Sequence, residues 1–102
     1  MKVIGSEKLV DFSIRHGNAK DALEAWFVVI KHATWKSTHE IKARYPSADF
    51  LSGNRVIFNI KGNHYRLVVK IDYEKQKAII EWLGTHALCD KLKLQLAHRH
   101  PS

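Results

Sequence analysis

Residues 55–83, RVIFNIKGNHYRLVVKIDYEKQKAIIEWL, decide the fold of this chain. The stretch contains three segments rich in Val, Ile, Tyr, Phe and Trp, the residue types that favour strands. They are Arg55–Lys61, His64–Tyr73 and Lys77–Leu83. Gly62-Asn63 and Glu74-Lys75 separate the segments and are short enough to be hairpin turns. The pattern therefore predicts three consecutive antiparallel strands.

A two-residue turn at Gly62-Asn63 fixes which residues of the first hairpin lie opposite one another. Arg55 then faces Lys70, and Asn59 faces Arg66, on one side of the ladder. The apolar pairs of the other side are Val56 with Val69, Phe58 with Leu67, and Ile60 with Tyr65. The two sides of the hairpin therefore differ sharply in polarity.

A turn at Glu74-Lys75 extends both sides onto the third strand. The apolar pairs are then Leu67 with Trp82, Val69 with Ile80, and Ile71 with Ala78. One face is thus apolar across three strands, and helices can cover it. The other face is polar and mainly cationic, with Arg55, Asn59, Lys61, His64, Arg66, Lys70, Asp72, Lys77 and Glu81. Such a face is either an ordinary solvated surface or a docking surface for a phosphodiester backbone.

Helices are predicted for the first half of the chain. Lys2–Ile4 is expected to start a short strand, and Ser6 is a candidate N-cap of a first helix. Asn18 is expected to cap a longer second helix, whose apolar residues at helical spacing are Leu23, Trp26, Phe27 and Ile30. Ser37-Thr38-His39-Glu40 is a capping box for a short third helix. The expected fold is α+β, with two N-terminal helices packed on a small twisted antiparallel sheet and a short helix before the sheet.

The composition limits the size and the setting of the molecule. With 102 residues, 45% of them apolar, we expect one domain over residues 1–102, with a tail from about residue 93. No apolar run is long enough to span a bilayer, and no secretion signal is visible at the N-terminus. Cys89 is the only cysteine, which fits a reducing cytosol. We therefore expect a soluble cytoplasmic protein.

The charge balance points to a polyanionic partner. Lys and Arg number 17 against 10 acidic residues, a formal net charge of +7. Residues 1–51 hold 8 basic and 6 acidic side chains, and residues 52–102 hold 9 and 4, so the surplus rises from +2 to +5. A basic surplus favours RNA or DNA, although a merely soluble surface also explains it.

Three motifs carry a resemblance to a known family. They are KARYPSA at 42–48, RVIFNIKGNHYRL at 55–67, and GTHA at 84–87 followed by Asp90-Lys91. In this order and spacing, together with Ala25-Trp26 and Thr34-Trp35-Lys36-Ser37, they resemble HigB-type toxins of the RelE/ParE superfamily. The resemblance runs from about Lys2 to Leu92. It implies a compact α+β fold, cleavage of messenger RNA in the ribosomal decoding site, and neutralisation by a cognate HigA-like antitoxin.

Cleavage of RNA without a metal or cofactor, which is what we expect here, uses the ribose 2′-hydroxyl as nucleophile. It needs proton transfer and cationic stabilisation of the phosphorane-like charge. His86 is the first candidate for proton transfer, because the ordinary pKa of histidine lies near neutrality. Packing against an aromatic residue is the alternative for this histidine. Arg66 is expected to hold the scissile phosphate by a bidentate contact. His64 is a second proton-transfer candidate, and Glu81 a possible general base.

The expected RNA-binding residues are those with cationic or amide side chains near these candidates, and one acidic residue of the last motif. They are Arg55, Asn59, Lys61, Asn63, Lys70 and Asp90. Other aromatic residues, Trp26, Phe27, Phe58 and Trp82, are expected in the core rather than against bases. His98 and His100 are not expected to bind a metal.

Two departures from the family pattern leave other functions open. Related sequences usually have a tyrosine where Cys89 precedes Asp90, and often a basic residue where Glu81 stands. The first alternative is therefore a weak or inactive toxin, a module that only binds nucleic acid or antitoxin. The second is a ParE-like gyrase poison, against which His86 and the basic face argue, because gyrase poisoning needs no proton-transfer group. Lys91–Ala97 suits either a helix or a strand.

Overall fold

The computed structural model describes residues 1–88, so the predictions for Cys89, Asp90, the segment 91–97 and the pair His98 and His100 lie outside the described residues. The elements are β1 (Lys2–Ile4), α1 (Glu7–Arg15), a 3-10 turn (Gly17–Ala19), α2 (Lys20–His32), α3 (Thr38–Arg44), β2 (Asp49–Leu51), β3 (Arg55–Ile60), β4 (Tyr65–Asp72) and β5 (Lys77–Thr85). None of the helices within residues 1–88 combines the length and the hydropathy needed to cross a membrane.

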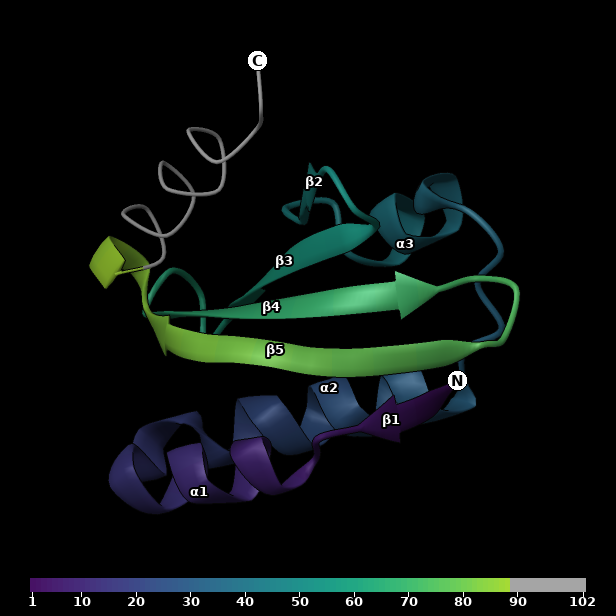
Figure 1. Ribbon diagram of the computed structural model, residues 1–102. Coiled ribbons are helices and arrows are strands. Elements are labelled where there is room, and N and C mark those ends of the chain that lie inside the picture. The colour runs from purple at the N-terminus through teal and green to yellow at the C-terminus, as the bar shows by residue number, and fades with distance from the viewer. Residues whose placement is uncertain (89–102) are drawn as a thin grey trace.

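The five strands form one sheet in the order β1-β5-β4-β3-β2. Figure 1 shows α1 and α2 lying together along one side of this sheet. The α+β class is confirmed, but the expectation of a purely antiparallel sheet is wrong at one edge, where β1 pairs with β5 in parallel. The chain passes through α1 and α2 and then the whole hairpin region before β5, and such a long connection permits a parallel neighbour. At the other edge, β2 is a three-residue strand that gave no sequence pattern.

The first hairpin has the predicted register. Arg55 pairs with Lys70, and Asn59 pairs with Arg66. The backbone N–H of His64 donates to the Lys61 carbonyl at 3.2 Å, which closes the turn around Gly62-Asn63. The register of β3 and β4 is therefore predicted correctly, although Ile57 and Val68 make part of the expected polar side apolar.

The second hairpin departs from the prediction halfway along β5. Val69 pairs with Ile80 as expected, but Val68, and not Leu67, lies opposite Trp82. Glu81 is the extra residue between these two pairs, so β5 has a β-bulge at this point. Consequently Glu81 and Trp82 both project from the face without helices, which we call the open face. Leu83 returns to the helix face and packs against its core.

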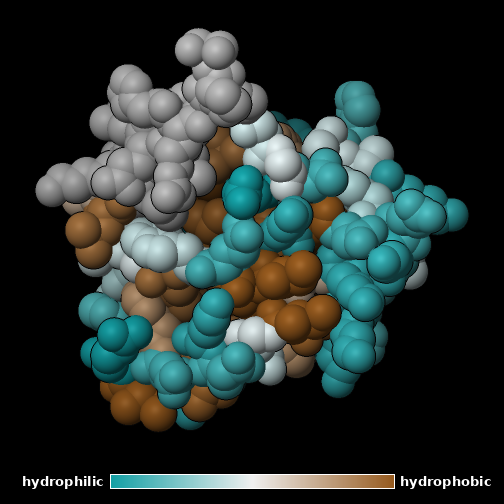
Figure 2. Space-filling model, viewed as in Figure 1, coloured by the Kyte–Doolittle hydropathy of each residue, from teal (hydrophilic) through white to brown (hydrophobic). Residues whose placement is uncertain are grey.

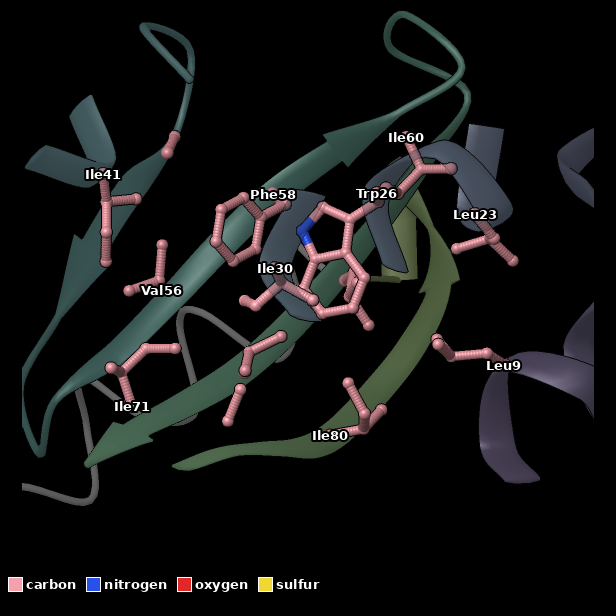
Figure 3. Close-up of a cluster of buried hydrophobic side chains, with 14 of the residues drawn as sticks. Leu9, Leu23, Trp26, Ile30, Ile41, Val56, Phe58, Ile60, Ile71 and Ile80 are labelled. Carbon is pink, nitrogen blue, oxygen red and sulfur yellow. The ribbon is translucent and has the colours of Figure 1, made fainter. Parts of the chain in front are cut away.

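The helix face of the sheet carries the main core. The apolar residues of β3, β4 and β5 meet α1, α2 and α3 there; Figure 3 labels Leu9, Leu23, Trp26, Ile30, Ile41, Val56, Phe58, Ile60, Ile71 and Ile80. Phe58 is fully buried, and its ring lies 5.4 Å from Trp26 and 5.2 Å from Tyr45, both edge to face. Fully burying one such side chain contributes about 1.5–3 kcal/mol. This core holds the strands rigidly, and with them the open face.

Two of the predicted helix starts differ in detail. Asn18 lies in the 3-10 turn, and its Oδ1 accepts a hydrogen bond from the Tyr65 hydroxyl at 2.7 Å. The prediction that Asn18 caps α2 is therefore wrong, because α2 begins at Lys20 after the turn. Ser37 does precede α3, but the box is shifted, since Glu40 accepts from the Lys36 N–H.

The outer side of the helix layer is apolar. A groove of about 660 Å³ runs between α1 and α2 and is lined by residues such as Leu9 and Phe27. At its rim, Val10, Ile14 and Val28 are 60%, 77% and 56% exposed. Figure 2 shows apolar surface along the lower edge of the molecule, where α1 lies.

Candidate functional site

Three rows of residues cross β3, β4 and β5 on the open face. We call them by one member each: the Arg66 row (Asn59, Arg66, Gly84), the Trp82 row (Ile57, Val68, Trp82) and the Arg55 row (Arg55, Lys70, Ile79). Side chains two positions apart on a strand are separated by about 7 Å. The polar residues that the sequence placed on one continuous face therefore form two groups, with an apolar row between them.

Arg66 is the centre of the first group. Its Nη1 lies 3.2 Å from Asp49 Oδ2, and its Nη2 lies 2.6 Å from His86 Nε2. The Arg66 side chain is only 12% exposed. A guanidinium can donate but cannot accept a hydrogen bond, so His86 Nε2 is the acceptor in this contact. The contact requires the tautomer in which Nε2 carries no proton.

His86 is held at the end of β5. The hydroxyl oxygen of Thr85 accepts a hydrogen bond from the Leu88 N–H at 3.3 Å, as an N-cap does, and residues 86–88 are helical. Residues 85–88 therefore form the end of β5 and a helical turn, with no loop directly after Gly84. Gly84 is a buried residue of β5 itself, paired with Arg66.

Two polar side-chain atoms of the Arg66 row are buried without a hydrogen-bond partner among residues 1–88. They are the Nε of Arg66, a donor, and the Oδ1 of Asn59, an acceptor. The amide nitrogen of Asn59 donates weakly to the Ser47 carbonyl at 3.4 Å. Buried polar groups are nearly always paired in folded proteins. An unpaired donor and an unpaired acceptor can serve polar atoms of a ligand.

The second group is built on the bulge. Arg55 Nε donates to Glu81 Oε1 at 2.7 Å, with side chains 29% and 31% exposed. Arg55 also reaches the Ser52 carbonyl at 3.5 Å. The Trp82 row separates this ion pair from Arg66, so the structure does not bring Glu81 together with His86 and Arg66.

The remaining predicted residues lie in the turn between β3 and β4, except Lys70, which belongs to the Arg55 row. Lys61, Asn63, His64 and Lys70 are all exposed. His64 precedes Tyr65, which pairs with Thr85, so it lies at the same end of the β4–β5 ladder as His86. Its ring is tilted against Tyr65, with centroids 6.2 Å apart.

Sequence reasoning missed Asp49. This residue begins β2 and pairs with Ile57, which brings its carboxylate to Arg66 from a strand that neither hairpin includes. A strand of three residues has too few positions to show alternation. An acidic residue close after the KARYPSA motif was the one available signal.

Comparison with known proteins identifies the family. The family model of the HigB toxin, the RelE-like toxic component of a toxin–antitoxin system, matches residues 19–92. The chain belongs to this family. The mRNA interferase toxin HigB of Escherichia coli (strain K12) is 30% identical over 88 residues, which cover 84% of this chain and 85% of that protein. The mRNA interferases HigB of Escherichia coli O157:H7 and Shigella flexneri match with the same identity and coverage.

Proposed function

We propose that this chain is an mRNA interferase that cuts messenger RNA on the ribosome and so inhibits translation. The observation that carries the proposal is the hydrogen bond between Arg66 and the Nε2 atom of His86 on the open face. The names of the related proteins support the substrate, since each is an mRNA interferase. The basic surplus of the chain suits the same polyanion.

The chemistry needs no metal or cofactor. His86 Nε2 takes the proton from a ribose 2′-hydroxyl, and the 2′ oxygen forms a bond to the adjacent phosphorus. The bond from phosphorus to the 5′ oxygen then breaks, and that oxygen must receive a proton. The products are a 2′,3′-cyclic phosphate and a 5′-hydroxyl. Arg66 turns from His86 to the phosphate as it arrives, which frees the lone pair of Nε2 and places a cation against the developing charge.

The other candidates receive roles according to their positions. His64 lies at the His86 end of the ladder and is our candidate donor to the 5′ oxygen. Asp49 orients the Arg66 guanidinium through Nη1. Glu81 accepts from Arg55 and is separated from Arg66 by the Trp82 row, so we assign it the orientation of Arg55 rather than proton transfer.

The phosphate and base contacts are assigned to residues of the Arg66 and Arg55 rows and of the turn between β3 and β4. Arg55, Lys61 and Lys70 bind backbone phosphates on either side of the cut. Asn59 and Asn63 contact a ribose or a base edge, and the unpaired Oδ1 of Asn59 is the acceptor for that contact. Asp90 stays a proposed RNA contact on the strength of the family pattern.

Membership of a toxin–antitoxin family implies an antitoxin partner. We propose a HigA-like protein in that role and the cytoplasm as the compartment, since ribosomes and messenger RNA are found there.

The test is cleavage of a defined messenger RNA by purified protein, with and without ribosomes. We expect cuts only with ribosomes, and 5′ ends that an adaptor joins only after treatment with a polynucleotide kinase, because the ends carry a hydroxyl. Arg66→Ala and His86→Ala should each lower the cleavage rate by about 10²–10³-fold, as loss of a charge-stabilising or proton-transfer group does. Arg66→Lys keeps the charge without the bidentate geometry, so its cleavage rate should lie between those of the parent and Arg66→Ala.

Circular dichroism of each variant controls for folding. A double variant, Arg66→Ala with His86→Ala, that cuts as fast as the parent contradicts the assignment of the site. Growth arrest on expression without any new 5′ ends points to gyrase poisoning, and RNA binding without cutting points to a module that has no catalytic activity.

A further inference from the structure

Trp82 is the aromatic residue that the β-bulge moves to the open face. A regular β5 pairing, as the sequence predicts, puts its indole opposite Leu67 and into the core. Instead it lies opposite Val68, one row from Arg66 and one row from Arg55. Trp26 and Trp35 are buried in the main core at 2% and 8% exposure, whereas Trp82 is partly exposed. An aromatic ring therefore stands between the two cationic groups.

Neighbouring residues of the open face fix the position of the Trp82 indole. Beneath it lie Ile57 and Val68, which are 1% and 2% exposed and form a second small apolar cluster with Leu51 and Trp82. Gly84 borders the ring: a Cβ atom added there would lie 2.6 Å from two atoms of the six-membered ring of Trp82. Any other residue at position 84 would push the ring from this position. The glycine of the GTHA motif thus has a function in placing Trp82.

We propose that Trp82 is the stacking platform for one base of the RNA strand whose phosphates Arg66 and Arg55 hold; this rests on the proposed function of the site. Sites for single-stranded RNA combine cations that follow the backbone with an aromatic ring on which a base stacks. The Trp82 row supplies the ring between the two cationic rows, and it does so on a rigid strand. Asn59 and Arg66, each with one unpaired polar atom, lie in the row next to the stacked nucleotide.

The first test separates binding from chemistry on ribosome-bound messenger RNA. Trp82→Leu keeps the apolar cover of Ile57 and Val68 but removes the π face. It should raise the half-saturating protein concentration by roughly 5- to 100-fold, the loss that removal of one stacked base produces. The limiting cleavage rate should change much less, and the preference among codons should weaken. Trp82→Phe should recover most of the affinity.

Gly84→Ala supplies the matched variant. It leaves the indole in the molecule but displaces it, so it should weaken binding in the parent and have no further effect in the Trp82→Leu background. If Gly84→Ala weakens binding equally in both backgrounds, Gly84 does not position the ring of Trp82, and this part of the proposal is overturned. Urea denaturation of Trp82→Leu gives the fraction of molecules that is folded under the assay conditions. If the loss of activity equals the loss of folded protein, Trp82 only covers the sheet, and the platform is overturned.

A readout without cleavage distinguishes this proposal from the proposed function. A short oligoribonucleotide with a 2′-O-methyl group at each ribose cannot be cut, and stacking on Trp82 should quench the tryptophan fluorescence that the Trp82→Phe variant lacks. Quenching in a protein that does not cut ribosome-bound messenger RNA supports the platform while the nuclease function fails. Absence of quenching at RNA concentrations that saturate binding, or absence of RNA binding altogether, overturns the platform even if cleavage is found.

Discussion

The two faces of the sheet use alternate residues of the same strands in opposite ways. On the helix face, Phe58 and its neighbours are buried against one another and against three helices. On the open face, Asn59 and Arg66 keep buried polar atoms that no residue from 1 to 88 pairs with. The helix face lowers the free energy of the fold mainly through apolar burial, whereas the open face leaves polar atoms of its own strands unpaired. The comparison indicates that the candidate site lies where polar side chains of the strands have hydrogen-bonding atoms without partners among residues 1–88.

The largest effect that we predict is the difference in stability between two single-residue deletions in β5. Deleting Glu81 should leave the protein folded, because the bulge residue has no cross-strand partner and its removal restores a regular ladder. The loss should not exceed the roughly 1 kcal/mol of a partly exposed ion pair. Deleting Ile79 should unfold the protein, because it moves the carboxylate of Glu81 into the buried position of Ile80 opposite Val69.

Thermal unfolding followed by circular dichroism compares the two deletions directly. The Glu81 deletion should also keep cleaving RNA, since Trp82, Gly84 and His86 keep their faces. If both deletions unfold the protein alike, the bulge is not the point where β5 tolerates a change in length.

The helix face was predictable from sequence because burial imposes a pattern. Val56, Phe58 and Ile60 occupy every second position of β3, and the turn at Gly62-Asn63 fixes their partners. The predicted pairing of Leu67 with Trp82 is wrong because of the bulge. The side chains before and after a bulge each alternate regularly, but the extra residue exchanges the faces on which the later side chains lie. The parallel pairing of β1 and the strand β2 depend on contacts far apart in the sequence, which a local pattern does not contain.

The candidate site was predictable in part. The sequence placed Arg66 beside Asn59, and the structure adds His86 at 2.6 Å from Arg66 Nη2. The sequence grouped Glu81 with them because the predicted polar face left out Ile57 and Val68, which form the apolar row between. It also assigned Trp82 to the core, where an aromatic residue is most often found. The single extra residue in β5 explains the second difference, because it turns Trp82 to the open face.

A pair of adjacent substitutions on β3 sharpens the comparison in terms of stability. Phe58→Ala leaves a cavity among Trp26, Trp35 and Tyr45 and should lower the free energy of unfolding by about 3–5 kcal/mol. Asn59→Ala removes a weak hydrogen bond and an unpaired oxygen, so it should cost less than about 1 kcal/mol. Urea denaturation measures both. Equal losses would mean that the open face contributes to the fold as much as the helix face.

The Arg55–Glu81 pair allows a smaller test of the open face. Glu81→Gln should change the free energy of unfolding by no more than about 1 kcal/mol, because both side chains are partly exposed, at 29% and 31%. It should also leave the cleavage rate within a few fold, since Glu81 contacts Arg55 and not His86. A fall in rate of 100-fold or more, at saturating protein, would instead make Glu81 a proton-transfer group.

The smallest effect concerns Tyr45, which packs against the core on the helix face. Burial raises the pKa of its phenol above the ordinary value of 10.0, and the nearby Arg44 guanidinium partly offsets this. A raised pKa in the folded state means that the folded protein holds the proton more tightly than the unfolded chain does. The stabilisation is complete below pH 10 and is lost as the pH rises through the folded-state pKa. Above pH 10, the free energy of unfolding of Tyr45→Phe should therefore fall less steeply with pH than that of the parent. Urea titrations at each pH measure it. The same slope in both proteins would mean that the phenol reaches solvent equally well in the folded and unfolded chains.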